Sequence, residues 1–326
     1  MYNVGEMIAM MNDNTYIPRR IRINISNKAF HIIKNDESCF ANINHKCRST
    51  KISDKIINTL IKSMDLSEIK EPTGRYIKYD GAATQKIKFD VKLSKGAYAE
   101  LENNNKKNKG VFVSSLLETY ANCAYYMREQ LYFAECIEKI NDIIARGNLI
   151  SVRYRNDEKE MLIYPYDVRT DEWSSYNYLI GTDITDTDHS GNGKLVNLRI
   201  SYISSYKAVP LKSSHPPRCY SQDEIEERIA ACGIQFIDEE PATIKVRLPK
   251  GQGNGKDMYD HMVFMRPVIS EMPVDPDDDI YTFRCTEKQA EYYFFKFGAK
   301  VEIIEPESLR NLFLSSYKEA YTLYNK

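Results

Sequence analysis

The chain has 326 residues, a length that suits two or three domains rather than one hydrophobic core. It is 42% hydrophobic and 28% charged with 14 Gly and 12 Pro, the composition of a folded protein, and no apolar run is long enough for a membrane-spanning helix. The seven Cys are scattered without a C-x-x-C pair, and residues 1–14 lack a basic start. The sequence therefore predicts a cytoplasmic protein with reduced thiols and no signal peptide.

The net charge of −1 hides an uneven distribution of charge along the chain. Residues 15–125 contain 20 Lys and Arg against 11 Asp and Glu, whereas residues 126–326 contain 25 against 33. A basic first third joined to an acidic remainder indicates a polyanion, such as a nucleic acid, as the partner of the first third. A solvated, lysine-rich surface is the alternative explanation.

Two segments of the basic third alternate polar and apolar residues, as a half-buried strand does. They are residues 20–26 (RIRINIS) and 86–92 (KIKFDVK), and they suggest a diverged internal repeat. Each is followed by two helix-like segments, with Ser53 and Ser94 as N-cap candidates. The predicted helices cover residues 27–35 and 53–64 in the first copy and 94–104 and 111–131 in the second, with a linker at 71–83.

Strand, helix, helix, twice over, resembles the ribbon-helix-helix family across residues 18–130. In that family two subunits each donate one strand to an antiparallel ribbon that enters a groove of nucleic acid. Because one chain supplies both strands here, the resemblance implies a pseudo-dimer whose outward side chains suit phosphates and base edges. The outer face is expected to hold Arg20, Arg22, Asn24, Lys86, Lys88 and Asp90, and the core face Ile21, Ile23, Ile25, Ile87, Phe89 and Val91. Asp90 would repel phosphate, and an ordinary amphipathic hairpin remains the alternative.

The middle of the chain predicts a small, strongly bent sheet or barrel. A helix over 135–145 ends at Arg146-Gly147, and strands are expected at 149–155, 160–167, 176–182 and 195–201. Asn156-Asp157 and Gly191-Asn192-Gly193 are hairpin signals between these strands. Closely spaced turns between short strands favour a barrel.

Residues 134–210 resemble the WYL domain, an SH3-like barrel found in bacterial transcription regulators and CRISPR-associated proteins. The matching stretches are 150–154 (ISVRY), 163–168 (IYPYDV), 178–181 (YLIG) and 198–203 (LRISYI). The family's Trp-Tyr-Leu run is Asn177-Tyr178-Leu179 here, the only tryptophan is Trp173, and a later basic position is Tyr202. The family's pocket is basic and is thought to bind nucleic acid or a nucleotide-like ligand. The resemblance implies roles for Arg199 and Tyr178, and Trp173 and Tyr154 are further candidates for stacking on bases. Burial in the barrel core is the alternative for Tyr154 and Tyr178.

The tail predicts a ferredoxin-like domain followed by a helix. Its segments read strand, helix, strand, strand, helix, strand and helix, at 242–248, 256–265, 268–272, 280–285, 287–297, 299–304 and 306–324. The run from Phe297 to Pro306 resembles the extension that often follows WYL domains and that commonly serves assembly. Five apolar and aromatic residues exceed what one helix face buries, so either both faces are covered within the domain or some of these residues meet a second subunit. The second interpretation predicts a homodimer. The five residues are Tyr292, Tyr293, Phe294, Phe295 and Phe297.

No constellation of residues in the sequence supports catalysis or a metal site. His31, Cys39, His45 and Cys47 lack the paired spacing of zinc ligands. The segment from Asp186 has Asn197 where a calcium loop needs a bidentate Glu, and the glycines before Lys256 do not complete a phosphate loop. No Ser/His/Asp or Cys/His set has recognisable flanking sequence. The prediction is a protein that is not an enzyme and has no metal or cofactor.

Together the segments predict an α+β protein of three domains. The boundaries are 15–130 for the ribbon-helix-helix-like domain, 131–215 for the WYL domain and 216–326 for the ferredoxin-like domain. This order resembles the WYL-domain accessory proteins encoded beside type VI-D CRISPR effectors, which target RNA. The resemblance implies a dimer that binds single-stranded RNA and enhances an RNA-guided nuclease. A ligand-sensing, DNA-binding transcription regulator and a protein–protein adaptor are the other hypotheses.

Overall fold

A computed structural model shows a mixed α+β protein. It describes residues 19–41, 52–63, 87–104, 108–155, 159–172, 174–185, 193–211, 219–248 and 280–325. The chain divides into two compact units, residues 1–138 with 201–204, and residues 139–200 with 205–326. Within the described ranges, no helix is both long and apolar enough to cross a membrane.

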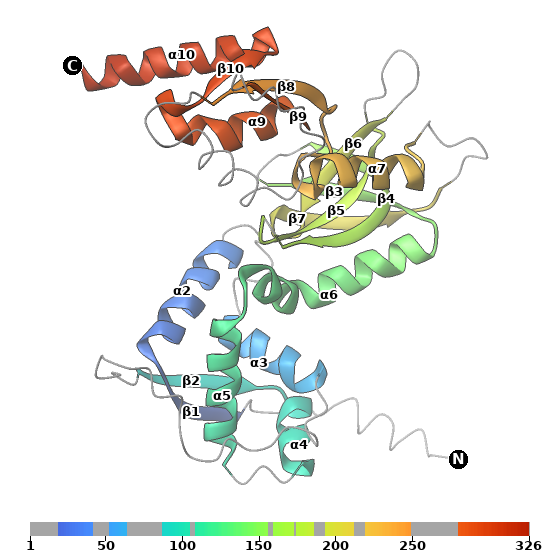
Figure 1. The fold of residues 1–326 in the computed structure, drawn as a ribbon. Helices are drawn as coiled ribbons and strands as arrows, with labels where there is room; N and C mark the ends of the chain where they lie inside the picture. The colour runs from blue at the N-terminus through green and yellow to red at the C-terminus, as the bar shows by residue number, and fades with distance from the viewer. Residues whose placement is uncertain are drawn as a thin grey trace. The chain divides into compact units, whose positions relative to one another are not determined.

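The first unit is built on a two-stranded antiparallel ribbon, drawn in blue and teal in Figure 1. Strand β1 (Arg19–Ile25) pairs with β2 (Ile87–Leu93), with Arg22 opposite Asp90 at the centre. Apolar side chains of both strands point to one face and are buried, as the two-residue period requires. The buried set is Ile23, Ile25, Val91 and Leu93. The predicted strands are confirmed, and so is the predicted buried face at Ile23, Ile25 and Val91, whereas Leu93 lies one residue beyond the predicted strand.

Four helices cover the buried face of the ribbon in a crossed arrangement (Figure 1). They are α2 (Asn27–Ala41), α3 (Ile52–Ser63), α4 (Lys95–Asn103) and α5 (Lys109–Asn122). Strand β1 and α2 pack on α5, whereas β2 and α4 pack on α3. The strand and first helix of each copy are thus covered by the second helix of the other copy, so neither copy has a core of its own.

Matching hydrogen bonds join the two crossed halves. Helix α2 follows Ser26, whose hydroxyl accepts from Ala29 N–H and whose backbone N–H donates to Glu118 on α5. Helix α4 follows Ser94, whose hydroxyl accepts from Ala97 N–H, and whose backbone N–H donates to Asn58 on α3. The Ser94 cap is confirmed.

One N-cap prediction and one helix prediction in the first unit are wrong. Ser53 lies inside α3 rather than before it, and its buried hydroxyl has no hydrogen-bond partner among the described residues. The predicted helix over 111–131 is two helices, because Cys123 is extended (φ −71°, ψ 154°) and ends α5. Helix α6 (Tyr125–Ala145) begins two residues later and absorbs the helix predicted at 135–145.

A buried ion pair ties the start of α6 to α2. The Asp36 carboxylate, 3% exposed, accepts from Arg128 Nε at 2.8 Å and from Tyr120 Oη at 2.7 Å. Arg128 also donates to the Cys123 carbonyl at 2.8 Å, at the break between α5 and α6. Burial and the neighbouring Asp36 raise the pKa of Tyr120, so its hydroxyl keeps its proton and donates.

The second unit contains a five-stranded antiparallel sheet in the order β6-β5-β4-β3-β7 (Figure 1). The strands are β3 (Leu149–Tyr154), β4 (Glu160–Asp171), β5 (Tyr176–Asp183), β6 (Lys194–Arg199) and β7 (Ile203–Val209). The prediction missed β7 and ran β6 through the short 3₁₀ helix η2 (Ile200–Tyr202). At Gly181 a Cβ atom would meet Ile163 Cγ2 and Tyr164 O at 2.6 Å, so only glycine allows this close approach of β5 to β4.

Helix α7 (Gln222–Cys232) and the 3₁₀ turn η3 (Ile234–Phe236) pack apolar side chains against the sheet. Ser221 and Glu224 form a complete capping box at the start of α7. The Ser-x-x-Glu spacing is visible in the sequence, yet no prediction was drawn from it. The apolar cluster beneath α7 includes Tyr178, Ile180, Leu195, Ile225 and Ile237.

The tail has a three-stranded antiparallel sheet in the order β10-β8-β9. Its strands are β8 (Ala242–Arg247), β9 (Ile280–Cys285) and β10 (Glu302–Glu305), joined by α9 (Glu287–Phe294) and the 3₁₀ segment η4 (Phe295–Lys300) and followed by α10 (Glu307–Tyr324). β9 and β10 therefore run parallel with β8 between them. The predicted helix 256–265 and strand 268–272 lie outside the described residues, so the ferredoxin-like assignment stays a prediction.

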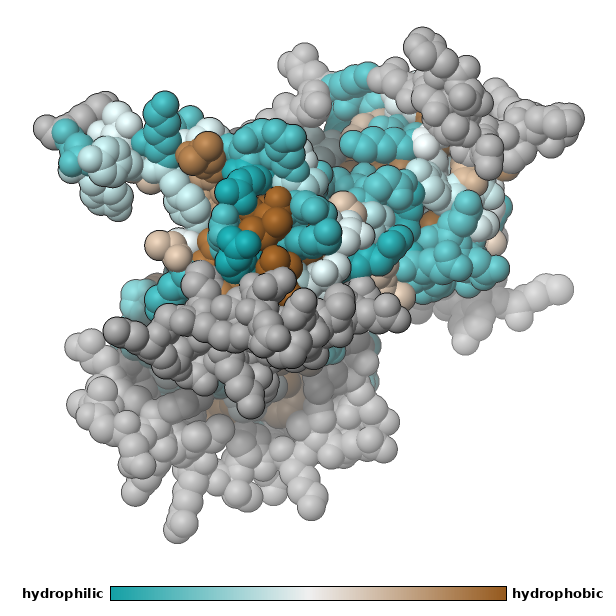
Figure 2. All heavy atoms as spheres, turned by 45° about the horizontal axis from the view of Figure 1, so that its top comes forward, coloured by the Kyte–Doolittle hydropathy of each residue, from teal (hydrophilic) through white to brown (hydrophobic). Residues whose placement is uncertain are grey.

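The C-terminal helix α10 buries only a narrow stripe, Leu309 and Phe313. Leu314, Tyr321 and Leu323 are each more than two-thirds exposed. Of the five aromatic residues noted in the sequence, Phe294 is buried, Tyr292 is exposed, and Phe295 stacks on Tyr317 at 4.8 Å. On the face drawn in Figure 2, brown apolar side chains form small patches among teal hydrophilic ones. The homodimer stays a prediction.

Candidate nucleic-acid interface

The outer face of the ribbon carries polar and basic side chains in three cross-strand pairs. The register places Arg20 opposite Lys92, Arg22 opposite Asp90, and Asn24 opposite Lys88. All of these residues are exposed except Asp90, which is half-buried. Because alternate residues of a strand share a face, the same period that buries the apolar set presents this set to solvent.

The central pair of the ribbon is an ion pair. Arg22 Nε donates to Asp90 Oδ1 at 3.0 Å. The hydrogen bond to Asp90 raises the pKa of Arg22, which stays charged in any case. Asp90 had been expected to repel phosphate from this face, and here it neutralises the guanidinium beside it.

Within the described residues, the cations on either side of the centre have no carboxylate partner. No described Asp or Glu forms an ion pair with the side chains of Arg20, Lys88 or Lys92. Arg20 and Lys92 stand directly opposite each other, and like charges in that position destabilise a ribbon. A bound anion would remove this repulsion, so the Arg20–Lys92 pair is the candidate phosphate contact of the ribbon.

More basic and aromatic groups gather at the Arg20–Lys92 end. The Arg19 guanidinium lies 4.3 Å from the centre of the Tyr98 ring, and Lys109 Nζ lies 5.4 Å from the same ring. Lys109 begins α5, where a Cβ on Gly110 would come within 3.4 Å of the Arg22 carbonyl. The start of α5 therefore lies against the ribbon backbone.

Sequence reasoning missed one residue of this face and proposed two that cannot be placed. Lys92 is the last residue of the predicted strand and continues the outward alternation two positions beyond Asp90, so the pattern contained it although the predicted outer face stopped at Asp90. Lys86 and Trp173 lie outside the described residues.

Tyr178, Arg199 and Tyr154, which the WYL resemblance suggested, lie on strands of the five-stranded sheet. Tyr178 pairs with Arg199 across β5 and β6 and with Arg169 across β4 and β5. Tyr178 is only 6% exposed, its hydroxyl lies 3.2 Å from Ser174 Oγ, and burial raises its pKa to about 12. Its ring belongs to the cluster under α7, so it offers no open face to a base. Tyr154 accepts a hydrogen bond from the Arg199 backbone N–H at 3.2 Å.

Arginines of the five-stranded sheet lie against acidic or aromatic partners. Arg169 donates to both carboxylate oxygens of Glu226 on α7, and Tyr166 Oη donates to the same carboxylate at 2.7 Å. The hydrogen bonds from Arg169 and Tyr166 hold the pKa of Glu226 at about 2. The Arg199 guanidinium lies 3.3 Å from the centre of the Tyr176 ring.

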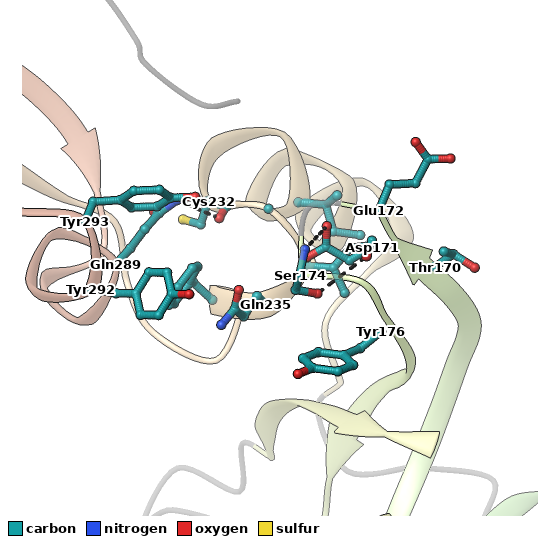
Figure 3. Close-up of a pocket in the computed structure, with 14 residues that line it drawn as sticks. Thr170, Asp171, Glu172, Ser174, Tyr176, Cys232, Gln235, Gln289, Tyr292 and Tyr293 are labelled. Atoms are coloured by element: carbon teal, nitrogen blue, oxygen red, sulfur yellow. Dashed lines mark hydrogen bonds between the residues drawn. The ribbon is translucent and has the colours of Figure 1, made fainter. Parts of the chain in front are cut away.

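A cavity of about 470 Å³ lies in the second unit, lined by the β4–β5 turn, the α7–η3 junction and α9 (Figure 3). Asp171, Glu172 and the rings of Tyr176, Tyr292 and Tyr293 are in its wall, together with uncharged residues and no described Lys or Arg. A wall that contains carboxylates and aromatic rings suits a donor-rich or cationic ligand better than a phosphate. This cavity is therefore a poor site for a nucleic-acid backbone.

The sequence segments tested for metal or phosphate loops give no site in the described structure. His31 and Cys39 lie on α2, while His45 and Cys47 lie outside the described residues, as do 186–192 and 249–279. In the described part of the chain, no three His, Cys, Asp or Glu side chains are grouped as metal ligands would be.

Comparison with solved structures shows the same overall fold in a crystal structure of a CRISPR Cas-related protein. That chain is 20% identical, the match covers 96% of both chains, and the TM-score is 0.68. A structure of proteasome accessory factor B/C from Arthrobacter aurescens matches 73% of this chain and 37% of its own length at 17% identity, with a TM-score of 0.27, which is too low to support an argument about fold. No protein-family model matches the chain, and no curated protein matches its sequence.

Proposed function

We propose that this chain is a non-enzymatic CRISPR accessory protein that binds single-stranded RNA through the outer face of its ribbon. Its partner is an RNA-guided RNA nuclease of type VI-D, whose activity it enhances. Two supports come together here: the fold similarity to a CRISPR Cas-related protein over nearly the whole chain, and the exposed cations of the ribbon.

The domain assignments behind this proposal follow the observed topology. The crossed strand-helix-helix halves are what a ribbon-helix-helix dimer joined into one chain requires. The five-stranded sheet with its tight β4–β5 approach suits a WYL-type barrel. The order β10-β8-β9 suits a ferredoxin-like tail.

The single observation that carries the proposal is the pair of facing cations, Arg20 and Lys92, with Lys88 at the other end of the same face. A polyanion binds most favourably where two cations face each other without a carboxylate, because binding relieves their repulsion and releases counterions. Tyr98, next to Arg19, supplies an aromatic ring at the same end for an unpaired base. The carboxylates in the cavity wall of the second unit and the burial of Tyr178 support a site on the ribbon rather than on the second unit.

The test is a titration of the full chain with fluorescent single-stranded RNA and with duplex DNA of equal length at two salt concentrations. Wild type is compared with a ribbon variant, Arg20→Ala, Lys88→Ala and Lys92→Ala. The matched control removes the same charge from the barrel strands, with Arg153→Ala, Lys194→Ala and Lys207→Ala. We expect tight RNA binding by wild type and by the control. The ribbon variant should bind on the order of a hundredfold more weakly, with a salt slope smaller by about 2.

The nuclease part of the proposal needs a second arm. Purified type VI-D nuclease with guide RNA cleaves a labelled RNA target with and without the full chain, and cleavage should rise with wild type and the barrel control but not with the ribbon variant. RNA binding without a change in cleavage would refute the enhancer role. Absence of RNA binding by wild type would refute the RNA-binding role.

A ligand-sensing, DNA-binding regulator is the second candidate, and the cavity of the second unit is the observation that favours it. A cavity of this volume is large enough for a small molecule. Tighter binding of duplex DNA than of RNA in the same titration would support this candidate.

A further inference from the structure

The ribbon has a pseudo-two-fold axis that passes between Arg22 and Asp90. These residues face each other at the centre of the register and are 68 positions apart. The same separation relates the two cap residues, Ser26 and Ser94, which are held by Glu118 and Asn58 in the same way. The repeat therefore aligns Arg20 with Lys88, rather than with Lys86 as the sequence pattern indicated. The two alignments of the strands differ by two residues, and such a shift keeps each side chain on the same face of the ribbon. The prediction of which residues point outward therefore does not depend on which alignment is used.

The scaffold on the two sides of this axis is alike in its buried residues. Ile23 corresponds to Val91 and Ile25 to Leu93, and all four are at most 2% exposed. Ala29 and Ala97 correspond in the same way on the first helices and are also buried. The core is thus close to symmetric in position and chemistry.

The exposed residues on the two sides are not alike. One half has four cations where the other half has one cation, two amides and an isoleucine. The corresponding pairs are Arg19 with Ile87, Arg20 with Lys88, Lys92 with Asn24, and Lys95 with Asn27. Lys28, which corresponds to Gly96, adds one cation to the poorer half and donates to Asn122 Oδ1 at 3.0 Å. On the outer face itself, the Arg20–Lys92 end has two cations and the Asn24–Lys88 end has one. Arg19 lies beside the richer end and pairs with Glu102 at 3.8 Å.

The centre of the ribbon breaks the symmetry most clearly. In a ribbon made by two identical chains, the residue at the axis faces its own copy, so an arginine would face an arginine and an aspartate an aspartate. Here Arg22 faces Asp90 and bonds to it at 3.0 Å. Only two different strands can make this attraction, and it leaves a neutral centre between a strongly and a weakly basic half.

We propose, on the basis of the RNA-binding function proposed above, that the ribbon binds its strand in one direction only. The Arg20–Lys92 half holds the phosphate backbone, and the Asn24–Lys88 half contacts bases through one amide and one ammonium group. A palindromic duplex presents identical half-sites and needs identical contacts on both sides of the axis. A single strand has a 5′ and a 3′ end and suits a face whose two ends differ.

The first test uses variants at corresponding positions, Arg20→Ala and Lys88→Ala, in the full chain. Each removes one exposed charge, so loss of folding is not expected, and thermal unfolding checks this. We expect Arg20→Ala to weaken binding of single-stranded RNA on the order of fivefold and Lys88→Ala on the order of twofold or less, because Arg20 acts together with Lys92. Equal losses in the two variants would overturn the proposal.

The second test measures direction itself. Single-stranded RNA carries a photoreactive thiouridine at its 5′ end or at its 3′ end, and crosslinked peptides of wild type are identified by mass spectrometry. We expect one labelled end to crosslink near residues 19–20 and 92–95 and the other near 24–27 and 87–88. Crosslinking of both labelled ends to both halves would overturn the proposal while leaving RNA binding intact. No RNA binding at all would overturn the proposed function and this inference with it.

Discussion

The ribbon of the first unit and the five-stranded sheet of the second both carry arginines and lysines along their strands, but these cations have different partners. In the five-stranded sheet, Arg169 bonds to Glu226, and Glu160 bonds to both Arg153 and Lys207. On the ribbon, Arg20 and Lys92 face each other, and no described carboxylate pairs with either. The net charge of a region says less about its ligand than whether each cation already has a carboxylate.

The difference also separates two uses of a cation within one chain. A paired cation fixes one element against another, as Arg169 fixes β4 to α7. A cation without a pair keeps its binding capacity for a ligand from outside. The variants below test whether paired cations stabilise the fold and unpaired cations bind the ligand, from the largest expected effect to the smallest.

The largest effect is expected where a paired cation is buried. Arg128→Met leaves the Asp36 carboxylate buried without its cation, and we expect the free energy of unfolding to fall by about 3–5 kcal/mol in urea titrations. Arg153→Met, at an exposed pair with Glu160, is the matched control and should change it by about 1 kcal/mol or less. A similar change in both variants would contradict a fixing role for the Asp36–Arg128 pair.

A carboxylate placed on the ribbon should make it resemble the barrel. In Lys92→Glu the new carboxylate faces Arg20 and pairs with it, so two cations are lost to the ligand. We expect RNA affinity to fall on the order of tenfold or more, measured by fluorescence anisotropy at moderate salt. Lys207→Glu makes the same charge change in the barrel and should leave the affinity within about twofold. Equal losses would show that only total charge matters.

The two cap serines test how far the crossed halves of the ribbon domain are equivalent. Ser94→Ala removes the acceptor for Ala97 N–H and should lower the free energy of unfolding by about 1 kcal/mol. Ser26→Ala should lower the free energy of unfolding somewhat more than Ser94→Ala does, because the Ser26 hydroxyl also donates to Glu118 at 2.9 Å. Chemical unfolding of both variants measures the two losses. If Ser26→Ala leaves the free energy of unfolding unchanged, the two halves differ in their buried hydrogen bonds as well as in their exposed charges.

The smallest effect concerns the Glu226 pair. The pKa of Glu226 is held below its ordinary value, at about 2, so its contribution to stability is complete above about pH 4.5 and is lost as pH falls toward 2. We expect Glu226→Gln to unfold at a lower temperature than wild type at neutral pH. The difference between the two unfolding temperatures should shrink as the pH falls from about 4.5 toward 2. A difference that does not depend on pH would contradict an ionic role for Glu226.

Strand position and face were predictable from the sequence because alternation is a local property. Ile23 and Val91 are buried and Arg20 and Lys88 exposed, as the two-residue period requires. The break at Cys123 was not predictable, since neither Gly nor Pro marks it and the Arg128 side chain that caps the Cys123 carbonyl belongs to the next helix. Strand β7 was missed because residues 195–209 form one apolar-rich run that η2 interrupts.

The candidate site was only partly predictable, for a different reason. Which residues point outward follows from the pattern, but which cations are neutralised depends on partners far along the chain. Arg22 meets Asp90 across 68 positions, and Arg169 meets Glu226 across 57. Such pairs depend on the fold, so the sequence identified the basic face but not its neutral centre. The burial of Tyr178 beneath α7 is a tertiary property of the same kind.

The crossed arrangement of the ribbon domain has a consequence for the timing of synthesis. Ser26 bonds to Glu118, 92 residues later, so β1 and α2 leave the ribosome well before the helix that covers them exists. At about 5–20 residues per second this interval lasts roughly 5–18 s. Until β2 has been made β1 lacks its partner strand, and until α5 has been made the apolar face of β1 lacks the helix that packs on it. We expect the nascent chain to be most prone to association with its neighbours during this interval.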